Sequence, residues 1–103
     1  MGLFDFLKGN KSKLIEDFKQ RGALVLDVRT VSEYNSGHIK NSKNIPLQNI
    51  NGSIEKIKGF NAPIITCCAS GMRSSNAASI LKRQGIEVVN GGGWQSLSKK
   101  LKP

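Results

Sequence analysis

The chain has 103 residues, which is enough for one domain with a single hydrophobic core and too few for two such domains. A hydrophobic content of 38% excludes a disordered chain, and two cysteines that are adjacent in the sequence exclude a disulfide framework and favour a reducing compartment. The formal net charge of +9 favours anionic partners, whereas an aromatic content of 6% and the lack of a base-reading motif disfavour nucleic-acid binding.

The N-terminal segment, residues 1–11, is predicted to be an extension in front of a domain that spans residues 12–103. Asp5 interrupts its apolar residues and no small-residue cleavage site follows, which argues against a signal peptide. Phe6 stands where the myristoylation pattern requires Ser or Thr. We expect the apolar side chains of this segment to pack on the domain or on a partner rather than on a membrane. They are Leu3, Phe4, Phe6 and Leu7.

The first predicted helix covers residues 13–20, where Leu14, Ile15 and Phe18 share one apolar face and Gly22 follows as a stop signal. The next apolar run, residues 23–28, is long enough for a buried strand.

Asp27 and Arg29 lie at the end of this strand, and the carboxyl ends of parallel strands are where open α/β sheets place their sites. An isolated charge near a core needs a partner. We therefore interpret the pair as a buried support for a site rather than as reacting groups.

Thr30 and Glu33 have the spacing of a capping box, so a short helix is predicted to begin there and to end by Gly37. His38 follows and is the one histidine of the sequence. It could act as a base toward a cysteine, or it could be a structural hydrogen-bonding residue. Further along, residues 44–46 predict a short strand. Residues 47–58 have isoleucines at near-helical spacing, and we expect them to support the fold rather than to form a site.

The centre of the sequence is residues 64–81, in which an apolar β-branched run meets two cysteines, a short loop and an alanine-rich helical pattern. This order predicts a strand, a loop and a helix. Cys68 would then lie at the carboxyl end of the strand and face the amino end of the helix, where unpaired backbone N–H groups favour an anion. Such surroundings lower the pKa of a cysteine and favour the reactive thiolate.

The loop after Cys68 is predicted to curl around the sulfur atom. The backbone amides of residues 69–73 can point inward, Gly71 supplies the positive φ that a tight curl needs, and Arg73 closes the ring with positive charge. A phosphatase cradle is the alternative chemistry, but its signature has five residues between Cys and Arg, whereas this loop has four. The shorter loop encloses less volume and fits a sulfur atom better than a phosphoryl group.

The remaining sequence predicts a helix over residues 73–84, a last strand over residues 86–89 and a final helix that begins at Trp94. Between the last two, residues 91–93 are three glycines, which let the backbone pass close to neighbouring structure. A phosphate-binding glycine loop is disfavoured there, because the G-x-G-x-x-G pattern and its acidic partner are missing.

Four patterns in this order resemble the rhodanese-like sulfurtransferases, in the form of a small single-domain member. The patterns are residues 26–29 with 33–34, 37–39 and 44–46; residues 68–74; residues 77–81 with Gly85; and residues 91–94. The resemblance implies an α/β, three-layer fold with a mostly parallel sheet of four or five strands and helices on both faces. It also implies that the histidine at position 38 is a structural residue of its loop.

The implied reaction is a double displacement in which Cys68 takes a sulfane sulfur from a donor such as thiosulfate or a persulfide and passes it to cyanide or a thiol. The residues of the implied binding loop are Ala69, Ser70, Gly71, Met72, Arg73 and Ser74. The supporting residues are Asp27, Arg29, His38 and Cys67. We expect no metal ion and no cofactor, a monomer in the cytoplasm, and as partners a small anionic donor and a thiol, cyanide or protein acceptor.

The sequence allows alternatives for the sulfur donor, for the role of Cys67 and for enzymatic turnover. Ala69 and Ser70 stand where the family often has cationic residues that hold thiosulfate, so a persulfide or polysulfide donor remains an alternative. Cys67 is either a packing residue at the strand end or a second thiol that resolves the persulfide. Finally, the domain could be a non-enzymatic sulfur carrier or protein-interaction module instead of an enzyme, and a small phosphatase is the less favoured third reading.

Overall fold

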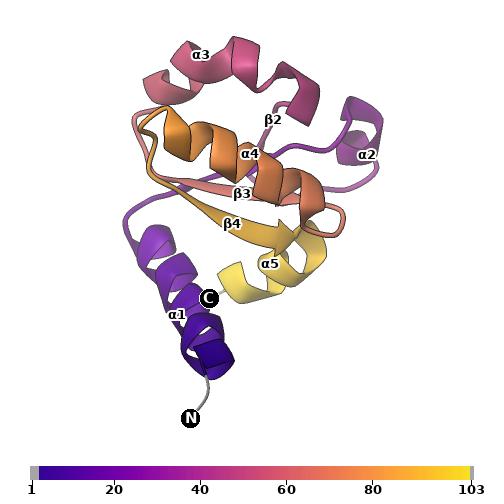
Figure 1. Cartoon of the computed structure of the whole chain (residues 1–103). Coiled ribbons are helices and arrows are strands. Elements are labelled where there is room, and N and C mark those ends of the chain that lie inside the picture. The colour runs from indigo at the N-terminus through magenta and orange to yellow at the C-terminus, as the bar shows by residue number, and fades with distance from the viewer. Residues whose placement is uncertain (1–2, 103) are drawn as a thin grey trace.

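The computed structural model describes the backbone of residues 3–102 and the side chains of residues 11–102 (Figure 1). The predicted packing of Leu3, Phe4, Phe6 and Leu7 therefore lies outside the described side chains. The regular elements, in chain order, are α1 (Leu3–Gln20), β1 (Leu24–Asp27), α2 (Val31–Asn35), β2 (Lys43–Asn44), the 3₁₀ turns η1 (Leu47–Asn49) and η2 (Asn51–Ser53), α3 (Ile54–Gly59), β3 (Ile64–Cys68), α4 (Met72–Arg83), β4 (Val88–Gly93) and α5 (Trp94–Leu101).

Within residues 3–102 the strands form one four-stranded sheet in the order β2-β1-β3-β4, and all neighbouring strands are parallel. The predicted α/β fold with a mostly parallel sheet is thus confirmed. Strand β3 lies between β1 and β4, and all five of its residues are buried, as expected for an inner strand with helices on both faces. A register shift between Thr66 and Cys68 interrupts the pairing with β4 at the end of β3.

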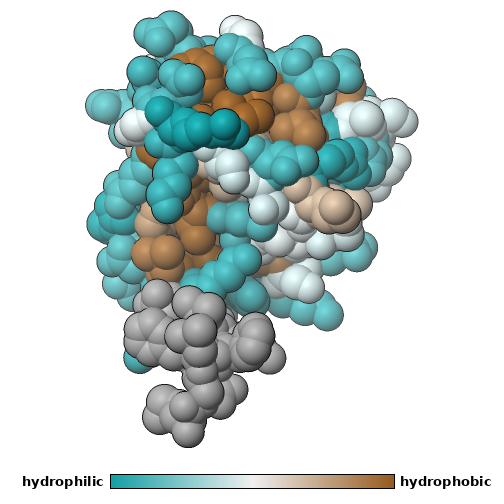
Figure 2. Space-filling model, viewed as in Figure 1, coloured by the Kyte–Doolittle hydropathy of each residue, from teal (hydrophilic) through white to brown (hydrophobic). Residues whose placement is uncertain are grey.

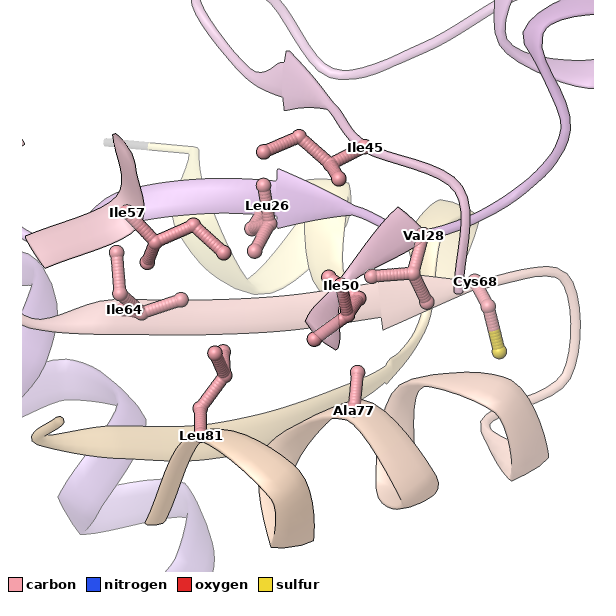
Figure 3. Packing of buried hydrophobic residues seen from close by; sticks show 9 residues of the cluster. All are labelled: Leu26, Val28, Ile45, Ile50, Ile57, Ile64, Cys68, Ala77 and Leu81. Carbon is pink, nitrogen blue, oxygen red and sulfur yellow. The ribbon is translucent and has the colours of Figure 1, made fainter. Parts of the chain in front are cut away.

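The hydrophobic core has two halves, one on each face of the sheet, and Figure 1 shows α3 and α4 on one face and α1 and α5 on the other. Side chains alternate between the faces along a strand. Ile64 and Cys68 of β3 therefore pack with the cluster on the α3 and α4 side, and Ile65 and Cys67 pack with the cluster on the α1 and α5 side. Figure 3 shows the first cluster between β3 and α4.

Three expectations about the elements need correction. The first helix begins at Leu3 instead of residue 13, because no proline interrupts residues 3–12 and the helix continues through them. Leu14 does not share the buried face of Ile15 and Phe18, since it is 40% exposed. The last strand is β4 (Val88–Gly93) instead of residues 86–89, so that residues 91–93 belong to it. Residues 47–58, predicted as scaffold with isoleucines at near-helical spacing, contain two 3₁₀ turns followed by α3.

Gly91 shows why glycines extend the last strand. A Cβ atom at this position would lie 2.7 Å from Leu97 Cδ2 and 2.8 Å from both Ile65 Cγ2 and the Thr66 carbonyl oxygen. The predicted close passage of the backbone is therefore confirmed. It lets α5 follow directly after β4 and pack Leu97 into the core.

The face of the molecule in Figure 2 is mostly hydrophilic, with exposed apolar residues in patches between the polar ones. No helix within residues 3–102 combines the length and the apolar character needed to cross a bilayer.

Candidate active site

The candidate site is the loop between the central strand β3 and helix α4. Cys68 is the last residue of β3, and α4 begins at Met72 with Gly71 as its N-cap. Gly71 has a φ of 107°, a left-handed backbone conformation that residues other than glycine rarely adopt. The predicted strand, loop and helix, and the positive φ at Gly71, are confirmed.

The sulfur of Cys68 accepts hydrogen bonds from two backbone amides. The Gly71 amide nitrogen lies 3.0 Å from Sγ and the Ser74 amide nitrogen lies 3.3 Å away. The Ser74 hydroxyl oxygen is also 3.3 Å from Sγ. Figure 3 shows the Cys68 side chain pointing toward the first turn of α4. The cradle therefore exists, although it uses the amide of Ser74, which lies beyond the predicted span of residues 69–73.

The surroundings of Cys68 act on the pKa of its thiol in opposite directions. Burial raises the pKa, since only 1% of the residue is exposed. The Ser74 hydroxyl and the amides of Ser74, Gly71 and Ser70 lower it, and together they outweigh burial, so that the pKa of Cys68 lies below its ordinary value. Hydrogen bonds to the charged form thus favour the thiolate, as expected for a nucleophilic cysteine.

A second layer of hydrogen bonds holds the cradle in place. The Ser74 hydroxyl lies 3.1 Å from the Gly71 carbonyl oxygen, and Thr66 Oγ1 donates to the Ser74 carbonyl at 3.0 Å. Asn90 Nδ2 donates to the Gly71 carbonyl at 3.4 Å, and Asn90 Oδ1 accepts from the Gly92 amide at 2.9 Å. Sequence reasoning missed Thr66 and Asn90. Their polar side chains near the carboxyl ends of adjacent strands, where they pair in register, were the available signal.

Arg73 binds a carboxylate instead of lying over the sulfur. Its two terminal nitrogens lie 2.7 and 2.9 Å from the two carboxylate oxygens of Glu33. The Arg73 guanidinium and the Thr30 amide lower the pKa of Glu33 to about 2. Arg73 was expected to close the loop around the Cys68 sulfur. Its guanidinium instead binds Glu33 of α2, and Arg73 acts on Cys68 only through its charge. The capping box of Thr30 and Glu33 is confirmed, and it fixes the carboxylate that holds Arg73.

Asp27 and Arg29 form a buried ion pair, with an Nη2 to Oδ2 distance of 2.7 Å and side-chain exposures of 0% and 5%. The remaining Arg29 donors reach the carbonyls of Glu33 at 3.2 Å and Gly37 at 2.7 Å. The guanidinium also lies 4.7 Å from the ring centroid of Trp94. The pair therefore anchors α2, and with it the Glu33 carboxylate, to the end of β1, which agrees with a supporting role.

His38 does not take part in the hydrogen bonds of Cys68. Its Nδ1 donates to the Tyr34 carbonyl at 2.8 Å, and its ring stacks on the Tyr34 ring with the centroids 3.8 Å apart. The exposed imidazole thus closes the turn after α2. Its contacts agree with the structural reading and give no support to a base toward Cys68.

Cys67 is fully buried on the opposite face of the sheet from the cradle, among Ile65, Val89 and Leu97. Burial and the nearby charge of Asp27 raise the pKa of its thiol well above the ordinary value. Both cysteines are free thiols. A vicinal disulfide would require Cys67 to leave its core, so the packing reading is the one that its contacts favour.

The chain is similar to known proteins that share this fold. A family model described as the rhodanese-like domain matches residues 10–100. The thiosulfate sulfurtransferase GlpE of Pseudoalteromonas translucida is 35% identical over 78 residues, which are 76% of this chain and 73% of GlpE. YrkF of Bacillus subtilis, a protein proposed to carry sulfur, is 35% identical over 80 residues, which are 73% of this chain and 43% of YrkF.

Among solved structures, a rhodanese-related protein from Thermoplasma volcanium superimposes with a TM-score of 0.71 at 31% identity, over 89% of this chain and 91% of that one. The match of the family model covers nearly all of the sheet and its helices, including the loop around Cys68. The chain therefore belongs to the rhodanese-like domain family.

Proposed function

We propose that this protein is a sulfurtransferase in which Cys68 carries the transferred sulfur as a persulfide. The observation that carries the proposal is the pair of amides, from Gly71 and Ser74, that donate to Cys68 Sγ at 3.0 and 3.3 Å. The likeness to GlpE supports the same chemistry. Because both cysteines are free thiols, a reducing compartment such as the cytoplasm suits the reaction.

In the loading step, the Cys68 thiolate attacks the outer sulfur of a donor such as thiosulfate. A bond forms between Sγ and that sulfur while the S–S bond of the donor breaks, and sulfite leaves with the electron pair. In the unloading step, cyanide or an acceptor thiolate attacks the outer sulfur of the persulfide. The Sγ–S bond breaks, its electron pair returns to Cys68, and thiocyanate or an acceptor persulfide leaves.

The cradle contributes more than a higher thiolate fraction. A thiolate loses nucleophilicity as its pKa falls, with a Brønsted coefficient of about 0.4–0.5, so part of the gain in ionisation is lost in attack. The fixed amides act in both steps, because they face the place where negative charge is held on sulfur. We infer that their main effect is electrostatic stabilisation of that charge, as in an oxyanion hole.

A turnover assay with two cysteine variants tests the proposal. With thiosulfate or a polysulfide as donor and cyanide as acceptor, we expect thiocyanate formation by the native protein and none by Cys68→Ser. Cys67→Ser is the matched control, since its side chain lies on the other face of the sheet, and it should retain most of the activity. Loss of activity in Cys67→Ser with retention in Cys68→Ser would show that Cys67, and not Cys68, carries the sulfur.

A second candidate function is a sulfur carrier that is loaded and unloaded by partner proteins, and the likeness to YrkF favours it. The two functions share the Cys68 persulfide but differ in turnover. An enzyme forms many equivalents of thiocyanate per chain from a small donor, whereas a carrier is loaded once and needs a protein to continue. Fewer than two equivalents with every small donor would select the carrier.

A further inference from the structure

A cavity of about 430 Å³ lies beside the cradle and has no part in holding the Cys68 sulfur. Its apolar walls are Val28, Val31, Pro46 and Leu47. The other residues that line it are Thr30, Gln48, Asn49 and Arg73. Two of its lining residues adjoin the site: Val28 packs in the same cluster as Cys68 and lies next to it in Figure 3, and Arg73 belongs to the first turn of α4. Val31 is 56% exposed, although valine is apolar.

The charge of this region argues against a doubly charged donor. No residue between Cys68 and Arg73 carries a charge, and the charge of Arg73 is matched by Glu33 at 2.7 Å. A dianion such as thiosulfate would lose water here without an unpaired cationic side chain from the loop to replace it. An apolar group would instead gain from burial against the valines and Leu47.

We propose that the cavity is the subsite for an organic substituent of the sulfur donor, so that the protein prefers singly charged sulfane donors with an apolar group to thiosulfate. This inference rests on the proposed function of Cys68. A thiosulfonate, R–SO₂–S⁻, is a donor of this class. The Cys68 thiolate attacks its outer sulfur, the Sγ–S bond forms, the bond to the sulfonyl sulfur breaks, and the sulfinate R–SO₂⁻ leaves with the electron pair.

The kinetic test compares methanethiosulfonate with benzenethiosulfonate, which both release a sulfinate, and uses thiosulfate as the third donor. A free small thiol gives the intrinsic ratio of their rates. We expect the ratio of kcat/KM for the phenyl donor to that for the methyl donor to exceed the free-thiol ratio by at least about tenfold. A factor of about ten is the least that an apolar pocket adds for one methylene-sized group. Thiosulfate should be the slowest of the three.

Two matched variants locate the preference. Val31→Ser alters a wall of the cavity, and Leu14→Ser alters an exposed apolar residue of α1 that does not line it. Val31→Ser should lower the phenyl-to-methyl ratio of kcat/KM several-fold, whereas Leu14→Ser should leave it as in the native protein. Equal ratios in the two variants, or a native ratio no larger than that of the free thiol, would overturn the subsite.

A binding experiment separates this inference from the proposed function. Benzenesulfinate, the leaving group, is titrated into Cys68→Ser while amide chemical shifts are recorded. Shifts gathered at Val28, Val31, Leu47 and Arg73 support the subsite even if no sulfur transfer is found, which would overturn only the proposed function. If those amides do not shift, the subsite is wrong whatever the activity of the native protein.

Discussion

At the scale of single residues, the site depends on one hydroxyl that has two acceptors. Ser74 Oγ lies 3.1 Å from the Gly71 carbonyl oxygen and 3.3 Å from Cys68 Sγ, and it has only one hydrogen to donate. When Cys68 is a thiol, its S–H donates to Ser74 and the Ser74 hydroxyl donates to Gly71. When Cys68 is a thiolate, the hydroxyl turns to the sulfur, and Asn90 Nδ2 still donates to the Gly71 carbonyl. Ionisation is therefore accommodated without movement of the backbone.

Ser74→Ala should raise the pKa of Cys68, because it removes a donor to the thiolate and leaves the backbone amides in place. The measurement is the rate of alkylation by iodoacetamide as a function of pH, whose midpoint should move to higher pH. Ser75→Ala is the control, since Ser75 is exposed on the same turn of α4. An unchanged midpoint in Ser74→Ala would show that the amides alone set the pKa.

At the scale of elements, two helices that follow adjacent parallel strands are joined by Arg73 and Glu33. Helix α2 follows β1 and presents Glu33 from its capping box, and α4 follows β3 and presents Arg73 from its first turn. The pair is about one third exposed, so its contribution is partly screened by water. Its geometric effect is to fix the start of α4, which also donates the Ser74 amide to Cys68.

The Glu33 pair predicts a pH dependence of stability. The pKa of Glu33 is about 2 in the folded protein, below its unfolded value of about 4.3. The Glu33 carboxylate therefore stabilises the fold fully above about pH 4.3, and this stabilisation is lost as the pH falls toward 2. Urea unfolding between pH 5 and 2 should show a smaller loss of stability in Glu33→Gln than in the native protein. A loss of the same size in both would mean that Arg73 does not stabilise the carboxylate.

The elements also show what the sequence could and could not predict. The strand, loop and helix around Cys68, the capping box at Thr30 and the glycine with positive φ follow from local residue order and were predicted. The partner of Arg73 and the role of Asn90 depend on how separate strands align in the sheet. Spacing along the chain does not contain that alignment, so these long-range contacts required the structure.

At the scale of the whole molecule, β3 contributes to the site on one face of the sheet and to the hydrophobic core on the other. The face toward α4 presents Cys68 to the cradle, while the face toward α1 and α5 buries Cys67 in the core. The buried pair of Asp27 and Arg29 connects the sheet to α2 and to Trp94 at the start of α5. Stability and site geometry therefore depend on the same ion pair.

Asp27→Ala should destabilise the protein by about 3–5 kcal/mol, because it leaves the Arg29 charge buried without its partner. Asp17→Ala is the control, since it removes an exposed partner of Arg21 and should cost no more than about 1 kcal/mol. The measurement is the free energy of unfolding in urea. Losses of equal size would show that the buried pair does not anchor the fold.

The most direct test of the Cys68 persulfide is the mass of the Cys68 peptide after the protein has been incubated with a sulfane donor and digested without reductant. We expect the peptide to gain the mass of one sulfur atom, the label to lie on Cys68 rather than Cys67, and cyanide to remove it. A peptide that stays unmodified with thiosulfate, a polysulfide and a thiosulfonate, or sulfur found on Cys67, would contradict the claim that the Gly71 and Ser74 amides prepare Cys68 to carry sulfur.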